Sequence, residues 1–124
     1  MPGTASVWNQ KALRASAGSS FRLPVASLPH TSLLRKLGEK KIPMYACVAN
    51  DGASIFEADL RGPVAFVIGN EGAGISAEIL SFCSGRLYVP CPGQVESLNA
   101  AIAASIVLYE ASRQRSVASL QDKP

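Results

Sequence analysis

Apolar and polar stretches follow one another along this chain in a pattern that predicts alternating strands and helices. The clearest stretch is Val64 to Ile68, an uninterrupted apolar run typical of a strand buried on both faces of a parallel sheet. Ile42 to Ala49 and Arg86 to Val89 are predicted as further strands. Phe21 to Val25 is a short strand candidate, and Ser54 to Leu60 a weak strand or turn.

Helical patterns lie between these runs. The predicted helices are Asn9 to Ala17 with Asn9 as N-cap, Leu33 to Lys40 with a cap at Thr31 or Ser32, Ser76 to Phe82, and Leu98 to about Arg113. Strands that alternate with helices indicate an α/β fold. We therefore expect a mostly parallel sheet with helices on both faces.

The last predicted helix is apolar or small nearly all round. Leu98, Ile102, Ile106 and Tyr109 share one side, but alanines and Val107 extend the apolar surface around the helix. A helix of this kind must be buried on several sides. It is either a central core helix within one subunit or a helix covered by a partner subunit. We expect residues from about 114 to 124 to form a flexible tail.

Composition indicates a single folded domain over residues 1–124, with 48% hydrophobic residues. No apolar run approaches the roughly 20 residues that span a bilayer, and no signal peptide is visible, so we expect a cytoplasmic protein. The three cysteines form no C-x-x-C pair and His30 is the single histidine, which argues against a metal site. The net charge of +3 suits RNA contact, but solvated helix faces explain it equally well.

Two glycine-containing turns carry most of the information about function. Gly69 to Gly74 follows the strand that ends at Ile68, and Pro90 to Asn99 follows the strand that ends at Val89. Open α/β sheets bind ligands outside the carboxyl ends of their strands. The two turns therefore predict a ligand pocket between them.

The chemistry of the turns limits what the pocket binds. The glycine order G-x-x-G-x-G differs from the dinucleotide fingerprint, and no Gly-Lys-Ser/Thr of a P-loop is present. The carboxylate of Glu71 would repel pyrophosphate, so a neutral or cationic ligand fits better. Ser97 is either a helix N-cap or a polar group at the pocket. With one histidine, in a loop, a Ser-His-Asp hydrolase has little support.

Together the two turns closely resemble motifs two and three of the SpoU/TrmH family of RNA methyltransferases, within the SPOUT class. The matching stretches are Phe66-Val-Ile-Gly-Asn-Glu-Gly-Ala-Gly74 and Val89-Pro-Cys-Pro-Gly-Gln-Val-Glu-Ser-Leu-Asn99, and the likeness continues to Glu110. Upstream, Lys11 to Gly18 and Phe21 to Pro24 also look like the family's sequence. The resemblance covers nearly the whole chain.

The resemblance implies methyl transfer from S-adenosylmethionine to a ribose 2′-hydroxyl of rRNA or tRNA. It also implies a C-terminal trefoil knot that forms the cofactor pocket, and a homodimer through the last helix. By the same resemblance, the cofactor is held by residues at the strand ends and at the start of that helix: Ala49, Ile68, Gly69, Asn70, Val89 and Leu98. Glu71, Ser97 and Asn99 match polar active-site positions of the family.

One motif of the family has no counterpart. The first motif, an Asn followed by an Arg, should precede Lys11, and Arg14 belongs to a different segment. We therefore expect a chain truncated at its N-terminus relative to the family. An alternative to an active methyltransferase is a non-catalytic fragment that binds cofactor and dimerises. A Rossmann-type nucleotide-binding protein is a weaker alternative, because the glycine order and Glu71 disfavour it.

Overall fold

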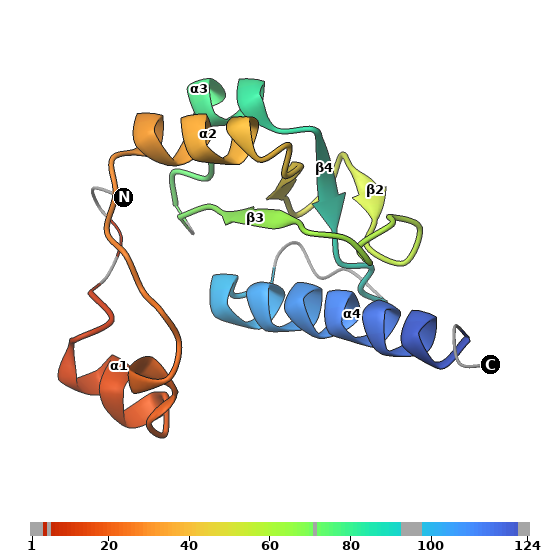
Figure 1. Ribbon diagram of the computed structural model, residues 1–124. Coiled ribbons are helices and arrows are strands. Elements are labelled where there is room, and N and C mark those ends of the chain that lie inside the picture. The colour runs from red at the N-terminus through yellow and green to blue at the C-terminus, as the bar shows by residue number, and fades with distance from the viewer. Residues whose placement is uncertain (1–3, 5, 71, 93–97, 122–124) are drawn as a thin grey trace. The chain divides into compact units, whose positions relative to one another are not determined.

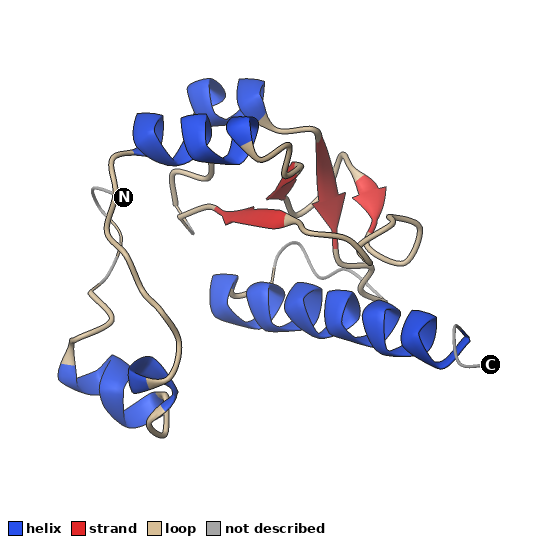
Figure 2. Cartoon of the chain, viewed as in Figure 1, coloured by secondary structure: helices blue, strands red, loops and turns tan. Residues whose placement is uncertain are grey.

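The computed structural model describes residues 4, 6–70, 72–92 and 98–121 (Figure 1). The chain divides into two compact units, Met1–Lys36 and Leu37–Pro124, where the sequence predicts one domain. Every buried hydrophobic side chain among the described residues belongs to the second unit. The elements, coloured by type in Figure 2, are α1 Gln10–Ala15, the 3-10 helix η1 Ser19–Phe21, α2 His30–Glu39, β1 Met44–Cys47, β2 Ala53–Ser54, β3 Ala65–Ile68, α3 Ala77–Phe82, β4 Gly85–Tyr88 and α4 Ala100–Gln121.

The second unit is built on a parallel sheet. In the described part of the chain the sheet has four strands in the order β2-β4-β1-β3, and each neighbouring pair is parallel. In the central register Ala46 of β1 lies between Val67 of β3 and Arg86 of β4. The predicted α/β fold with a parallel sheet is therefore confirmed. Because the strands are parallel, their carboxyl ends meet at one edge of the sheet.

Helices lie on both faces of this sheet. Figure 1 shows α3 and α4 on opposite sides of it. Side chains of β1 alternate between the two faces, as in any strand. Tyr45 and Cys47 pack against the core beneath α4, whereas Met44 and Ala46 are buried on the other face. α2 spans the division between the two units.

The core lies between the sheet and α4. It joins Leu87 of β4 to Val107 and Ala111 of α4, and includes Ile55 and Leu60 from the segment after β2. All five are at most 3% exposed. Burial of each of the larger side chains contributes about 1.5–3 kcal/mol to folding. This packing fixes α4 along the sheet.

A polar contact attaches the second half of α4 to the same segment. The Gln114 carboxamide accepts a hydrogen bond from the backbone nitrogen of Leu60 at 2.8 Å and donates one to the carbonyl of Ala58 at 3.1 Å. It also donates to Glu110, a buried carboxylate paired with Arg113. One side chain thus satisfies two backbone groups of a loop that precedes it by more than 50 residues.

Replacing Gln114 with alanine should destabilise the protein by about 1–3 kcal/mol, because two backbone groups lose their partners in a half-buried site. Chemical denaturation monitored by circular dichroism measures the change. Ser119→Ala is the matched control, since its hydroxyl contacts only the carbonyl of Ser116 in the same helix. Equal denaturation midpoints for both variants would show that the contact contributes no net stability.

The N-terminal unit differs from prediction in two places. Asn9 caps α1 as expected, accepting a hydrogen bond from the Lys11 nitrogen at 2.9 Å. The strand predicted at Phe21 to Val25 is wrong. The carbonyl of Ser19 accepts hydrogen bonds from the nitrogens of residues 22 and 23, so the chain turns there instead of extending. α2 begins at His30, ahead of the predicted cap, because the Pro29 carbonyl accepts the first bond of its first turn.

α4 differs from prediction in length and burial. It continues to Gln121 and so includes most of the segment predicted as a tail; the contacts of Gln114 attach this part to the second unit. Its sides differ in solvent exposure, because Val107 and Ala111 are buried whereas Leu108 and Tyr109 are exposed. The central-core alternative for this helix is therefore wrong. No helix in the described ranges combines the length and hydrophobicity needed to cross a bilayer.

Candidate functional site

A cavity of about 620 Å³ opens at the carboxyl ends of β1, β3 and β4, beside the start of α4. Its size is within the range of small-molecule sites, roughly 300–1,000 Å³. All the described residues that line it belong to the second unit. They include every residue that the resemblance assigned to the cofactor, together with Asn99: Ala49, Ile68, Gly69, Asn70, Val89, Leu98 and Asn99.

The loop after β3 forms one wall and folds back on itself. Asn70 and Gly74 form an antiparallel bridge with backbone hydrogen bonds of 3.1 and 2.8 Å. The Asn70 carboxamide oxygen closes the loop further by accepting from the nitrogens of Gly72 and Ala73 at 2.8 and 3.2 Å. Gly74 has a φ of +66°, a conformation that favours glycine. The side-chain oxygen of Asn70 thus shapes the cavity wall.

Gly69 lies where the loop approaches itself most closely. A Cβ on this residue would be 2.8 Å from the carbonyl carbon of Gly74 and 2.9 Å from Cγ1 of Ile75. Real Cβ atoms do not approach other heavy atoms this closely, so only glycine fits without a shift of the loop. Gly69 also lines the cavity, directly after the end of β3.

The ends of β1 and β4 form the second wall. The Val48 nitrogen donates to the Leu87 carbonyl at 2.9 Å, which extends the pairing of the two strands to the cavity. Burial raises the pKa of the Cys47 thiol to about 11, and the nearby Cys83 adds to this rise. The thiol is consequently neutral at physiological pH. No Lys, Arg, Asp or Glu is found among the described lining residues.

The start of α4 closes the cavity. The carboxamide oxygen of Asn99 accepts hydrogen bonds from the nitrogens of Ala101 at 3.0 Å and Ile102 at 3.4 Å. This side chain is therefore the N-cap of α4, a role that the sequence suggested for Ser97. Cysteine, alanine and valine side chains complete this part of the lining, from Cys91, Ala100, Ala103 and Val107.

Two of the three predicted polar active-site residues, Glu71 and Ser97, lie outside the described residues. Sequence reasoning missed other lining residues, among them Val48, Asn50 and Ile75. Asn50 directly follows the predicted strand that ends at Ala49, so the same strand-end rule would have found it. His, Cys, Asp and Glu side chains of the described segments form no group of three that suits a metal ion.

Comparison with known proteins matches this chain to one family. The profile of the SpoU rRNA methylase family matches residues 1–109. A curated relative is the 23S rRNA (guanosine(2553)-2′-O)-methyltransferase RlmP of Bacillus subtilis (strain 168), which is 39% identical over 107 residues. That match covers 86% of this chain and 43% of the relative. The chain thus spans less than half the length of this relative.

Solved structures agree with the sequence match. The SpoU methyltransferase AviRb from Streptomyces viridochromogenes, in complex with the cofactor AdoMet, superposes with a TM-score of 0.80 at 34% identity, over 92% of this chain and 47% of that one. An AdoMet-bound rRNA methyltransferase from Sinorhizobium meliloti superposes with a TM-score of 0.81 at 29% identity, over 89% and 42% of the two chains.

Proposed function

Because the chain belongs to the SpoU rRNA methylase family, we propose that its cavity binds S-adenosylmethionine for methyl transfer to a ribose 2′-hydroxyl of rRNA or tRNA. The observation that carries this proposal is the joining of three strand ends and the start of α4 around one cavity. The described lining mixes apolar side chains with the carboxamides of Asn50, Asn70 and Asn99, and it has no cation to repel a sulfonium or to attract phosphates. These properties suit the cofactor better than a nucleotide polyphosphate.

The lining residues have different roles in such a site. Backbone groups at Gly69, Val89 and Leu98 hold the cofactor, with Ala49, Ile68 and Asn70 beside them. The cofactor supplies an electrophilic methyl group, and the walls position it toward the acceptor, which supplies rate through orientation. Asn99, together with Glu71 and Ser97, orients the acceptor or the loops around it. A ribose hydroxyl also needs a base or a polarising cation.

The non-catalytic alternative has one observation in its favour. The chain covers 43% of a relative that is named for this activity. Calorimetric titration with S-adenosylhomocysteine and a tritiated-methyl assay on total RNA separate the two functions. Binding with transfer supports the methyltransferase, and binding without transfer supports the fragment. Absence of binding by the folded protein contradicts both.

We also propose that the chain between β4 and α4 forms the trefoil knot of this family. Leu98 and Asn99 line the same cavity as Gly69 and Gly74, although 24 to 30 positions separate them in the chain. This placement is what the knotted cofactor pocket requires. The path of residues 93–97, on which the knot depends, lies outside the described residues.

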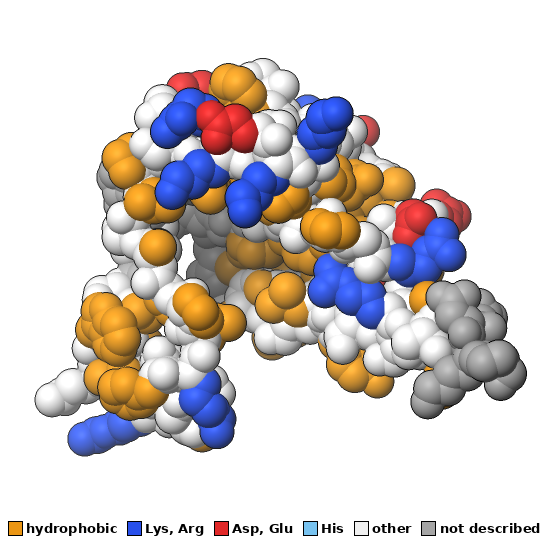
Figure 3. Space-filling model, in the orientation of Figure 1, with side chains coloured by type: hydrophobic (Ala, Val, Ile, Leu, Met, Phe, Trp, Pro, Cys, Tyr) orange, Lys and Arg blue, Asp and Glu red, His pale blue; other side chains and the backbone are white. Residues whose placement is uncertain are grey.

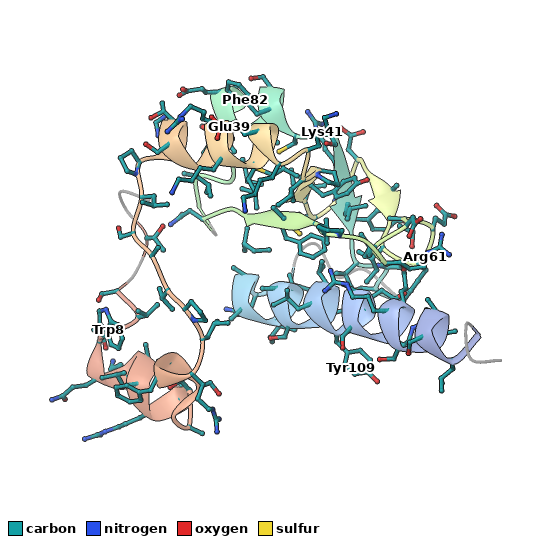
Figure 4. The ribbon with its side chains drawn as sticks, viewed as in Figure 1. Trp8, Glu39, Lys41, Arg61, Phe82 and Tyr109 are labelled. Atoms are coloured by element: carbon teal, nitrogen blue, oxygen red, sulfur yellow. The ribbon has the colours of Figure 1, made fainter. Side chains whose placement is uncertain are left out.

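The exposed side of α4 supports a homodimer. Five large apolar side chains on this helix are between 41% and 72% exposed: Ile102, Leu108, Tyr109, Val117 and Leu120. Figure 4 shows Tyr109 pointing away from the sheet. Exposed apolar side chains gathered on one helix are typical of interaction sites. We propose that a second copy covers this side of the helix.

Replacing Tyr109 with aspartate should convert the dimer to a monomer, because a carboxylate in an apolar interface loses its hydration without gaining a partner. Sedimentation velocity over a range of protein concentrations measures the change. Tyr109→Phe is the matched control, since it keeps the ring and should keep the dimer. A dimer that persists in Tyr109→Asp would place the interface elsewhere.

A further inference from the structure

The positive charge of this protein is concentrated in its first unit. Residues 1–36 contain five Lys or Arg residues and no Asp or Glu, for a net charge of +5. Residues 37–124 contain seven Lys or Arg and nine Asp or Glu, for a net charge of −2. The overall charge of +3 therefore conceals two units of opposite sign.

Three of these cations lie on or near α1. Lys11 and Arg14 are one turn apart on the helix and share a face. Arg22 follows η1, and its guanidinium donates to the hydroxyl of Ser19 at 3.4 Å. All three side chains are exposed, and the unit has no carboxylate to neutralise them. Figure 3 shows blue and orange side chains, and no red ones, on the part of the molecule that carries α1.

Two aromatic rings are close to these cations in the sequence, because Trp8 lies three residues before Lys11 and Phe21 directly precedes Arg22. Trp8 is 58% exposed and Phe21 is 75% exposed. Their ring centroids are 6.1 Å apart and their planes meet at 48°. Leu23, 68% exposed, extends the apolar surface. Every base has a π-face that stacks on such rings, whatever the sequence of the nucleic acid.

We propose that this surface, formed by Trp8, Lys11, Arg14, Phe21 and Arg22, docks single-stranded RNA. Lys11, Arg14 and Arg22 contact phosphates, and the two rings stack on bases. The proposal rests on the proposed function in that RNA is the substrate, and it gives that substrate a surface distinct in residues from the cavity. A polypeptide partner would also cover the rings. The absence of any acidic residue from the unit favours a polyanion instead.

The single tryptophan provides a direct probe of this surface. A fluorescein-labelled oligouridylate, titrated with the full chain, should gain anisotropy over the same concentrations at which an unlabelled oligouridylate quenches Trp8 fluorescence. The Phe21→Ala variant should bind about 5- to 150-fold more weakly, the range found when one stacking ring is removed. Replacing Lys11, Arg14 and Arg22 with alanine should reduce the slope of log affinity against log salt by about 2.

A matched variant removes the same number of charges from the second unit. Arg61, Arg86 and Arg115 contact Asp59, Asp51 and the Gly62 carbonyl. Replacing these three with alanine should leave the salt slope nearly unchanged. Equal losses in the two triple variants would overturn the proposal, because they would show attraction by net charge alone. Far-UV circular dichroism verifies that both variants are folded.

The remaining outcomes separate this proposal from its rivals. Quenching of Trp8 that depends on protein concentration and not on RNA would overturn it in favour of a second copy of the chain. RNA binding without quenching would also overturn it, since the rings would then be remote from the bases. Titration with S-adenosylhomocysteine on the same samples tests the proposed function separately. Normal cofactor binding without RNA-dependent quenching contradicts only the docking surface.

Discussion

Gly69→Ala should weaken the binding of S-adenosylhomocysteine by about 5- to 150-fold, which corresponds to the roughly 1–3 kcal/mol cost of an overpacked site. The added Cβ would lie 2.8 Å from the carbonyl carbon of Gly74 and 3.0 Å from its oxygen. These are backbone atoms, so no side-chain rotation relieves the clash. The loop after β3 must move, and this loop is a wall of the cavity.

Gly72→Ala is the matched control within the same loop. Its Cβ would lie 3.5 Å from Oδ1 of Asn70, an ordinary van der Waals contact. Calorimetric titration of both variants, with denaturation curves to verify folding, measures the difference. Equal affinities would show that the close packing of Gly69 does not shape the ligand site. A large loss for Gly72→Ala alone would show that residues 72–74, not Gly69, contact the ligand.

Local patterns were enough to predict the location of the cavity. The run from Val64 to Ile68 is apolar at every position, and the strand forms over Ala65–Ile68. Because the strands of the described sheet are parallel, the first one or two residues after β1, β3 and β4 reach the same edge of the sheet. Ala49, Gly69 and Val89 therefore meet at one cavity, although the sequence places them far apart. A simple rule about strand ends accounts for this result.

Contacts between distant segments could not be predicted in this way. The Gln114 side chain bonds to the backbone of residues that precede it by 54 and 56 positions, and no local pattern encodes that contact. The predicted end of the last helix near Arg113 failed for the same reason. Phe21 to Val25 has strand-like residues, but the hydrogen bonds to the Ser19 carbonyl hold the chain in a turn. Tertiary and turn contacts override propensity in these places.

The net charge of the whole chain concealed how the charged residues are distributed along it. A net charge of +3 did not distinguish a protein that binds nucleic acid from one with solvated helix faces. The distribution of charge is more informative, because the division of the chain after Lys36 separates a basic unit from an acidic one. That boundary is a property of the fold. Only after it is known do Lys11, Arg14 and Arg22 form one group in a unit that has no Asp or Glu.

Asn99→Ala and Asn99→Asp should separate the capping role of this residue from its role in the reaction. The Asn99 oxygen accepts from the Ala101 and Ile102 nitrogens at the start of α4. Alanine removes this cap and should destabilise the protein by about 0.5–2 kcal/mol. Aspartate keeps an acceptor oxygen and places a negative charge at the helix N-terminus, which is favourable. The aspartate variant should therefore be as stable as the original protein.

The rate of methyl transfer should not follow the stability of the two variants if the Asn99 carboxamide orients the acceptor. Both variants should then lose about 10²- to 10³-fold in the rate of RNA methylation, the cost of removing one preorganised donor. The dimer should persist in both, because Asn99 lies outside the exposed apolar side of α4. Tritiated-methyl assays and sedimentation measure the two properties. If Asn99→Asp retained the rate, capping alone would explain the residue, and orientation of the acceptor would depend on other groups.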